Sequence, residues 1–369
     1  MVSFRKFESV RSCLDVKSDQ ESYRIHIGAG NWPEMVAEIQ RALHPTQVVV
    51  AMDETVAELY GSSVLNALRD SGFAAGQLRC PPGESSKSTD MANSWWQELA
   101  GQAVDRQAVV IALGGGVVGD LCGFVAATYL RGLKFVQVPT TLLAQVDSSV
   151  GGKVGINLPT GKNLVGCFWQ PSLVWIDPSV LRTLSEREFS AGMAEVIKYA
   201  VLRDDGLLSL LEEHSTQILA RETEVMGLLV HRCCAIKADI VQRDPRENNG
   251  IRATLNFGHT VGHAIESLTG YKSVLHGEGV AMGMIAEARL AERIGLAPLG
   301  LADRLVELVR QYRLPTNLPK FTWEQWHQSM RRDKKNMGQQ IAFALPSAWG
   351  CVALTRDVSL ADVKAIVCG

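Results

Sequence analysis

The sequence lacks several features that would point to specialised classes of protein. It has no excess of one charge, because 37 lysines and arginines face 39 aspartates and glutamates, for a formal net charge of −2. General binding to nucleic acid needs a basic surplus that neutralises phosphates, so this function is not expected. The chain also has no run of about 18 apolar residues, and no membrane-spanning helix is expected.

Cysteine pairs and a leader segment are missing as well. None of the eight cysteines forms a C-x-x-C pair, and we expect most of them to be small buried hydrophobes in a reducing compartment. The charged N-terminal stretch lacks the apolar core of a secretory signal. We therefore expect a cytoplasmic protein.

The chain has 369 residues, of which 46% are hydrophobic, which is more than one core usually holds, so two domains are expected. Strands alternating with amphipathic stretches such as 54–71 and 91–103 predict an α/β domain over 1–178, with a parallel sheet covered on both faces. The remainder, 179–369, is predicted to be mainly α-helical. The expected strands are 24–28, 47–52, 108–113, 135–139 and 173–177. The expected helices of the second half are 188–202, 209–220, 224–241, 259–269 and 279–294.

A glycine cluster follows the third expected strand. Gly114, Gly116 and Gly119 fit G-x-G-x-x-G, in which glycines let the backbone approach a pyrophosphate at a helix N-terminus. The acidic residue usually found about 20 residues later is missing, so a standard Rossmann domain is not expected. Asp53 follows another strand, where it could bind a ribose hydroxyl or simply cap a helix.

A P-loop nucleotide site is not indicated. The stretch from Gly155 to Lys162 is one residue too long for that motif, and Asn163 replaces the Ser/Thr that would bind magnesium.

Three of the eight histidines lie close together in the sequence and suggest a metal site. His259 and His263 are four residues apart, on one helical face, and His276 follows. Position 260 is threonine, so the segment is not the H-E-x-x-H motif of a zinc protease. Glu195 could complete a His₂/Glu catalytic zinc site, or could merely form an ion pair with Lys198.

Several cations lie in segments that do not resemble ordinary solvated faces, and together they suggest a pocket for an anionic substrate. They are Lys153, Lys162, Lys237, Arg252, Lys334 and Lys335.

From about Tyr23 to about Arg356, the chain resembles the 3-dehydroquinate synthase family of the sugar phosphate cyclase superfamily. The segments that carry the resemblance are GGGVVGD, YLRGLKFVQVPTTLLAQVDSSVGGKVGIN, GKNLVGCFWQP, AGMAEVIKYA, LNFGHTVGHAIE, LHGE and RDKK. The resemblance implies an N-terminal Rossmann-like NAD-binding domain followed by a helical metal-binding domain. It also implies a cytoplasmic homodimer that acts as a carbon–oxygen lyase of the shikimate pathway, with NAD and Zn²⁺ or Co²⁺ as cofactors.

The resemblance also implies roles for individual residues. The metal ligands would be Glu195, His259 and His276. The catalytic residues would be His263, Lys153 and Glu247. The substrate contacts would be Arg131 (across the dimer interface), Asp147, Lys153, Asn163, Lys237, Arg252, Asn256, His263 and Lys334 or Lys335. The NAD contacts would be Asp53, Glu84, Lys87, Gly115, Gly116, Val117, Asp120, Thr140, Thr141, Lys162 and Thr183.

Two segments depart from the family pattern. The loop 246–252, which contains Glu247, is one residue longer than usual, and residues 1–22 are expected to form an extension.

Three alternative functions are compatible with these sequence features. A sister cyclase would make 2-epi-5-epi-valiolone or 2-deoxy-scyllo-inosose, but Leu255, Asn256 and His263 match the dehydroquinate synthase form. A metal-dependent polyol dehydrogenase would release NADH without losing phosphate. A non-enzymatic binding module would bind neither NAD nor metal.

Overall fold

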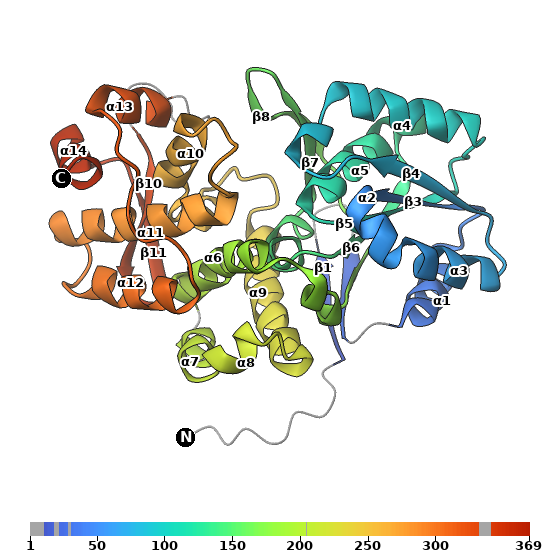
Figure 1. Ribbon diagram of the computed structural model, residues 1–369, viewed down its shortest axis with the longest axis horizontal. Coiled ribbons are helices and arrows are strands. Elements are labelled where there is room, and N and C mark those ends of the chain that lie inside the picture. Colours follow the sequence, from blue (N-terminus) through green and yellow to red (C-terminus); the bar gives the residue numbers. More distant parts are fainter. Residues whose placement is uncertain (1–10, 18–21, 29–30, 204, 332–340) are drawn as a thin grey trace. The chain divides into compact units, whose positions relative to one another are not determined.

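The computed structural model describes residues 11–17, 22–28, 31–203, 205–331 and 341–369 (Figure 1). The chain divides into two compact units, Met1–Leu184 with Met226–Ala238, and Ser185–Val225 with Asp239–Gly369. We expected a single boundary at residue 178, whereas the packing divides the chain after Leu184. The middle of helix α9 (Thr223–Arg243) belongs to the first unit.

The first unit is built on a seven-stranded sheet with the order β1-β2-β9-β6-β5-β3-β4. All neighbouring strands are parallel except the edge pair β1–β2. The five strands expected from the sequence are confirmed as β2, β9, β6, β5 and β3. The strands are β1 (Ser12–Lys17), β2 (Ser22–Ile27), β9 (Leu173–Ile176), β6 (Lys134–Pro139), β5 (Val109–Gly114), β3 (Val48–Asp53) and β4 (Ala75–Cys80).

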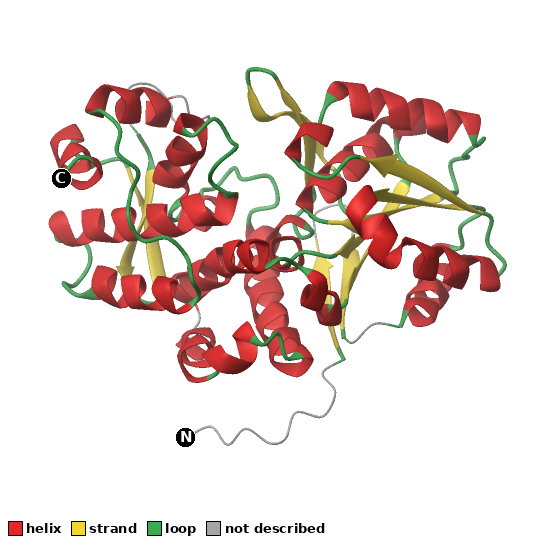
Figure 2. Cartoon of the chain, viewed as in Figure 1, coloured by secondary structure: helices red, strands yellow, loops and turns green. Residues whose placement is uncertain are grey.

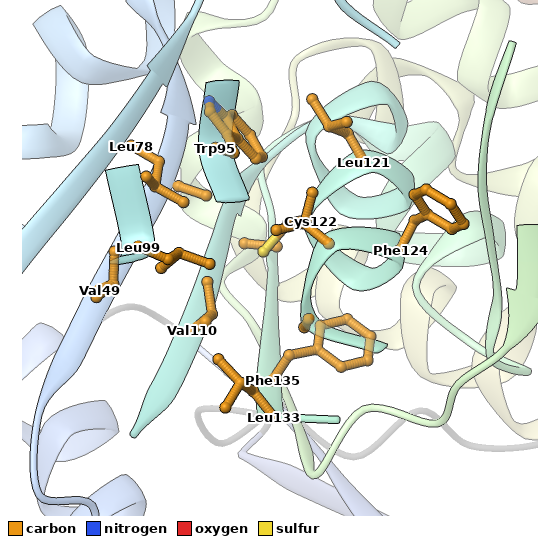
Figure 3. Close-up of a cluster of buried hydrophobic side chains, with 14 of the residues drawn as sticks. Val49, Leu78, Trp95, Leu99, Val110, Leu121, Cys122, Phe124, Leu133 and Phe135 are labelled. Carbon is orange, nitrogen blue, oxygen red and sulfur yellow. The ribbon is translucent and has the colours of Figure 1, made fainter. Parts of the chain in front are cut away.

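Alternating side chains of the central strands fill the two faces of this sheet. In β3, Val49 and Ala51 pack into one buried cluster, and Val48 and Val50 pack into the other. Figure 3 shows the first cluster, in which Leu99 lies beside Val49, and Trp95 and Phe124 fill other parts of the cluster. The sequences of the central strands are continuously apolar because helices cover both faces of the sheet.

The helical elements of the first unit are α1 (Trp32–Leu43), α2 (Glu54–Val56), α3 (Ser62–Asp70), α4 (Thr89–Gly101) and α5 (Gly116–Thr128). Short helical turns connect them, namely η1 (Ala57–Gly61), η2 (Glu84–Ser86), η3 (Tyr129–Arg131), η4 (Ala144–Ser148) and η5 (Pro178–Thr183). The expected helices 54–71 and 91–103 are thus present, the first interrupted by the wider turn η1.

Four strands of the first unit were not expected. Strand β1 lies in the segment that we expected to be an extension, and it pairs along its whole length with β2. Strand β4 forms the opposite edge of the sheet. An antiparallel hairpin of β7 (Lys153–Leu158) and β8 (Gly161–Phe168) stands apart from the main sheet.

The second unit is mainly helical, as expected, and Figure 2 shows its helices around one short pair of strands. The pair, β10 (Phe343–Ala348) and β11 (Cys351–Thr355), was not expected. The helices are α6 (Glu186–Arg203), α7 (Asp205–Glu213), α8 (Ser215–Leu219), α10 (His259–Leu268), α11 (His276–Arg293), α12 (Leu301–Gln311), α13 (Trp323–Arg331) and α14 (Leu360–Val367), with the turn η6 (Arg252–Asn256) before α10.

The expectation for the cysteines was only half right. Four are buried and four are exposed, and none is in a disulfide. The buried ones are Cys80, Cys122, Cys233 and Cys234, and the exposed ones are Cys13, Cys167, Cys351 and Cys368. Among the described helices, none is long and apolar enough to cross a membrane.

Candidate functional site

The second unit brings together one carboxylate and two imidazoles. Potential ligand atoms of Glu195, His259 and His276 all lie within 4.8 Å of one another. Oε1 of Glu195 is 3.6 Å from Nε2 of His259 and 3.7 Å from Nε2 of His276. The Glu195 side chain is completely buried. Such a His₂/carboxylate set matches the three protein ligands of a catalytic zinc site.

The hydrogen bonds of the two histidines leave the same nitrogen available to a metal. Nδ1 of His259 lies 3.1 Å from the carbonyl oxygen of Phe257, and Nδ1 of His276 lies 3.0 Å from Oε2 of Glu266. Both partners accept hydrogen bonds, so each Nδ1 carries a proton. Nε2 is therefore the nitrogen of each ring that a metal could bind beside Glu195, as in zinc-binding histidines.

The structure shows the ion pair of Glu195, one of its two sequence-based interpretations, and leaves its other oxygen facing the histidines. Its Oε2 forms an ion pair with Lys198, which is almost completely buried. Its Oε1 faces the two histidines. The ion pair is therefore compatible with a role for Glu195 as a metal ligand.

Glycines bring the helices that carry these three residues into backbone contact. A Cβ atom on Gly277 of α11 would lie 1.8 Å from the carbonyl oxygen of Ala191 in α6. A Cβ atom on Gly283 of α11 would lie 2.0 Å from the carbonyl oxygen of Gly258, next to His259. A side chain does not fit at such distances. Glycine at 277 and 283 therefore lets the helices pack closely enough to bring Glu195, His259 and His276 together.

Two buried carboxylates of this unit were not singled out from the sequence. Glu266 orients His276, as described above. Glu287 accepts hydrogen bonds from the backbone N–H groups of Gly258 (2.6 Å) and Val261 (3.1 Å), and so holds the first turn of the helix that starts at His259. A signal for Glu266 was available, because it follows His263 by three residues on the same helix. Glu287 lies too far along the chain for any local pattern to indicate its role.

The carboxylates make this position favourable for a cation. Burial acts to lower the pKa of His276, but the hydrogen bonds and charges of Glu195 and Glu266 outweigh it and raise the pKa to about 10. A metal ion would take the place of that proton, since metal ligands bind in their deprotonated form. The donor set and its charge therefore fit a divalent metal.

Other candidate residues lie along the same stretch of the second unit. The His263 ring lies 5.3 Å, between centroids, from that of His259 and 6.0 Å from that of His276. Arg252 and Asn256 are the first and last residues of η6, which precedes α10. His263 is thus next to the metal group without belonging to the Glu195 set.

The longer loop before η6 is organised by Asp244. Its carboxylate accepts hydrogen bonds from the backbone N–H groups of Asn248 (2.8 Å) and Arg252 (3.0 Å). These bonds lower the pKa of Asp244, although burial acts in the opposite direction. Within this loop, Glu247 has a positive φ of 59°, and the buried Arg252 donates to the carbonyl oxygen of Pro245 (2.9 Å).

The first unit holds the predicted nucleotide residues at the carboxyl ends of parallel strands. Gly115 caps the N-terminus of α5 directly after β5, and Thr140 and Thr141 follow β6. Ligands of open α/β sheets bind at this end of the strands. A Cβ atom on Gly119 would lie 2.8 Å from Oε1 of Gln137, so this glycine lets α5 lie close to β6.

Asp53 is a helix cap in this structure. Its Oδ1 accepts a hydrogen bond from the N–H of Val56 at 3.0 Å. It also stands at the carboxyl end of β3, so a contact with a ribose remains a prediction.

The structure joins several other predicted residues of the first unit directly. Nζ of Lys87 lies 2.5 Å from Oδ2 of Asp120 and 2.5 Å from Oδ1 of Asn163. Nζ of Lys237 lies 2.7 Å from Oδ1 of Asp147. Both lysine side chains are buried, so these cations are held inside the unit.

The other candidates of the first unit are spread over several elements. Thr183 bonds to the hydroxyl of Tyr60 (2.6 Å), Val117 lies in the first turn of α5, and Lys153 and Lys162 lie in β7 and β8. Arg131 is exposed, with a positive φ of 68°. Lys334 and Lys335 lie outside the described residues.

The chain combines a glycine turn at the strand ends of an α/β unit with a His₂/Glu group in a helical unit. This combination is typical of a nucleotide- and metal-dependent enzyme. Solved sugar phosphate cyclases share this fold. A 2-deoxy-scyllo-inosose synthase complexed with carbaglucose-6-phosphate, NAD⁺ and Co²⁺ has a TM-score of 0.87 at 24% identity, covering 96% of this chain and 99% of that one. A 2-epi-5-epi-valiolone synthase from Streptomyces hygroscopicus subsp. jinggangensis 5008, with NAD⁺ and Zn²⁺ bound, has a TM-score of 0.86 at 27% identity, covering 95% and 97%.

The sequence comparisons are more specific. Residues 77–191 match the N-terminal model, and residues 192–336 the C-terminal model, of 3-dehydroquinate synthase. A 3-dehydroquinate synthase from Symbiobacterium thermophilum is 48% identical over 92% of this chain and 95% of the relative. One from Geobacter metallireducens is 46% identical over 96% and 98%. The chain therefore belongs to the 3-dehydroquinate synthase family.

Proposed function

We propose that this enzyme is a 3-dehydroquinate synthase. It would convert 3-deoxy-D-arabino-heptulosonate 7-phosphate into 3-dehydroquinate and phosphate, as a carbon–oxygen lyase of the shikimate pathway. The observation that carries the proposal is the group of Glu195, His259 and His276, with both Nε2 atoms facing the carboxylate. It occurs in a chain that is 41–48% identical to curated synthases over nearly its whole length.

The cofactors follow from the residues and from the solved relatives. Glu195, His259 and His276 would hold Zn²⁺ or Co²⁺, and the strand ends around Gly115, Gly116, Val117, Thr140 and Thr141 would hold NAD, together with Asp53, Glu84, Lys87, Asp120, Lys162 and Thr183. The metal would supply Lewis acidity for substrate hydroxyls, and NAD would supply a reversible hydride acceptor.

The chain's cations and polar groups would bind the anionic substrate. We assign the phosphate to Lys153, Asn163, Asn256 and His263, and the carboxylate end to Lys237 and Arg252. Lys237 is already oriented by Asp147, and Arg252 by the carbonyl of Pro245. Oriented charges of this kind stabilise anionic intermediates without reorganising during the reaction.

Three residues would act on the reacting groups. His263 would move a proton at the phosphate oxygen, and Lys153 would stabilise the negative charge of the departing phosphate. Glu247, on the loop held by Asp244, would be the acidic catalytic group. Transient oxidation, β-elimination of phosphate, re-reduction and an intramolecular aldol step would then give the carbocycle.

We further infer a cytoplasmic homodimer in which Arg131 contacts the substrate bound to the partner subunit. The exposed position of Arg131 supports this role. Either Lys334 or Lys335 would add a further substrate contact.

One assay tests the proposal and separates it from its rivals. The metal-loaded chain is incubated with NAD and the seven-carbon phosphate, while phosphate and NADH are measured together. We expect stoichiometric phosphate with no net NADH, and loss of both binding and turnover after chelation. Net NADH without phosphate would indicate a polyol dehydrogenase, and no reaction with this substrate would favour a sister cyclase.

A further inference from the structure

The β7–β8 hairpin contains an irregularity at Asn157. Ile156 pairs with Val165 and Leu158 pairs with Gly161, so the register shifts around Asn157. One residue of β7, Asn157, thus lies opposite three residues of β8, 162–164, so the extra residues of this bulge belong to β8. Asn157 is half-buried, and its hydrogen bonds go to segments outside its own strand.

Asn157 joins three backbone and side-chain groups. Its Nδ2 donates to Oε1 of Glu84 at 2.7 Å, and its backbone N–H donates to the carbonyl oxygen of Lys87 at 2.8 Å. Its Oδ1 accepts from the backbone N–H of Asn163 at 2.8 Å. The orientation of the amide follows from its partners, because a carboxylate only accepts and a backbone N–H only donates.

The third partner has an unusual backbone conformation. Asn163 has a φ of 54°, in the left-handed region that few residues other than glycine and asparagine adopt readily. The hydrogen bond from its N–H to Asn157 stabilises this conformation. The side-chain carbonyl of Asn163 then accepts from Nζ of Lys87, which also pairs with Asp120.

These contacts form a closed network in the first unit. Glu84 and Lys87 lie on the segment between β4 and α4, while Asn157 and Asn163 lie on the hairpin. Four members of the network, Glu84, Lys87, Asp120 and Asn163, are assigned above to a ligand. Asn157 is the member with no assigned ligand, and it bonds to three of the other four.

We propose that Asn157 is a positioning residue that fixes the cofactor-contacting segment 84–87 and the phosphate-contacting Asn163 relative to each other. This inference rests on the proposed function, which assigns those residues to NAD and substrate. Because Asn157 bonds to both groups, its loss weakens the binding of both ligands. One residue that touches neither ligand then changes two affinities together.

The experiment compares two variants with a matched control. Asn157→Asp places a carboxylate against Glu84 and removes the donor, and Asn157→Ala removes all side-chain bonds. Asn93→Asp makes the same chemical change on an exposed position of α4. For each, the NAD Kd is titrated without substrate, kcat and KM are measured with the seven-carbon phosphate, and unfolding is followed in denaturant.

For Asn157→Asp we expect the NAD Kd and the substrate KM each to rise roughly tenfold, with a smaller fall in kcat, as the loss of one charge-assisted hydrogen bond suggests. Asn157→Ala should raise both by a smaller factor. In the double variant Glu84→Gln with Asn157→Asp, the new amide donates to the new carboxylate. The double variant should therefore bind NAD more tightly than the sum of the single changes predicts.

Several results would overturn the inference. The first is that both Asn157 variants match the Asn93→Asp control in Kd and KM. The second is an additive double variant, and the third is a loss of stability with unchanged ligand affinities. If the wild-type chain neither binds NAD nor releases phosphate, the proposed function itself fails, and the inference with it.

Discussion

The proposed metal group of the second unit (Glu195, His259 and His276) and the proposed nucleotide group of the first unit (around Gly115, Gly116, Thr140 and Thr141) are built by different means. Glu195, His259 and His276 are side chains on three helices, and the chemistry lies in those side chains. The nucleotide group is centred on strand ends, where Gly115 and Gly116 begin helix α5 directly after β5. The proposed metal group therefore depends on three side chains, whereas the proposed nucleotide group depends both on side chains and on where the backbone turns.

The largest expected effect comes from removing a metal ligand. His276→Ala should abolish metal binding and lower kcat/KM by at least about 100-fold, because the Lewis acid is lost. NAD affinity should change little. Metal content by elemental analysis, NAD titration and the phosphate assay check this prediction.

His327→Ala is the control for this change, since His327 lies in the same unit and stacks on Trp323. Full activity with a normal metal content in His276→Ala would remove His276 from the ligand set. Loss of NAD binding in the same variant would show that His276 also affects the nucleotide group.

The second effect comes from the backbone contact between α6 and α11. Gly277→Ala should lower the free energy of unfolding by about 3 kcal/mol, since its methyl group would overlap the carbonyl of Ala191. The metal affinity should fall in the same variant. Denaturant unfolding and metal titration measure the two losses.

Gly101→Ala is the matched control, because a Cβ atom at Gly101 would have no neighbour within 4 Å. There, we expect a stability change of no more than about 1 kcal/mol. Equal behaviour of the two variants would contradict the view that close helix contact sets the ligand geometry.

The third prediction tests the hydrogen bond by which Glu266 orients the proposed metal ligand His276. Glu266→Gln should weaken metal binding by roughly 10–100-fold, as is typical when the hydrogen-bond partner of a metal-bound histidine is changed. NAD affinity should stay the same. Glu307→Gln, on the exposed face of α12, serves as the control, and an unchanged metal Kd in Glu266→Gln would limit Glu266 to a structural role.

The smallest effect separates the two interpretations of Asp53. Asp53→Ala should cost about 1 kcal/mol of stability through the lost cap and should also weaken NAD binding. Asp53→Ser restores a capping oxygen on a shorter side chain. If Asp53 binds the ribose, the serine variant regains stability but not NAD affinity, and recovery of both would leave only the cap.

The same contrast explains how much could be predicted from the sequence. The central strands were predictable because the buried runs at β3 and β5 are continuously apolar. The helical second half was predictable from its long periodic segments. The edge strands β1 and β4 were missed because their exposed positions interrupt the apolar pattern.

The candidate site divides in the same way. Three clustered histidines indicated the metal group, because both their residue type and their spacing are visible in a short stretch of sequence. Glu287 and Asn157 gave no such signal. Their roles depend on hydrogen bonds to distant segments, 26 residues away for Glu287 and Val261 and 73 residues away for Asn157 and Glu84, and only the folded chain brings these together.

Strand β1 has a practical consequence for handling the protein. It covers the outer edge of β2 through six residue pairs from Ser12 to Lys17. A shortened chain that begins at Tyr23 would uncover a row of unpaired backbone groups, and such edges recruit strands from other molecules. Removing residues before Tyr23 to obtain a more homogeneous sample would therefore favour aggregation.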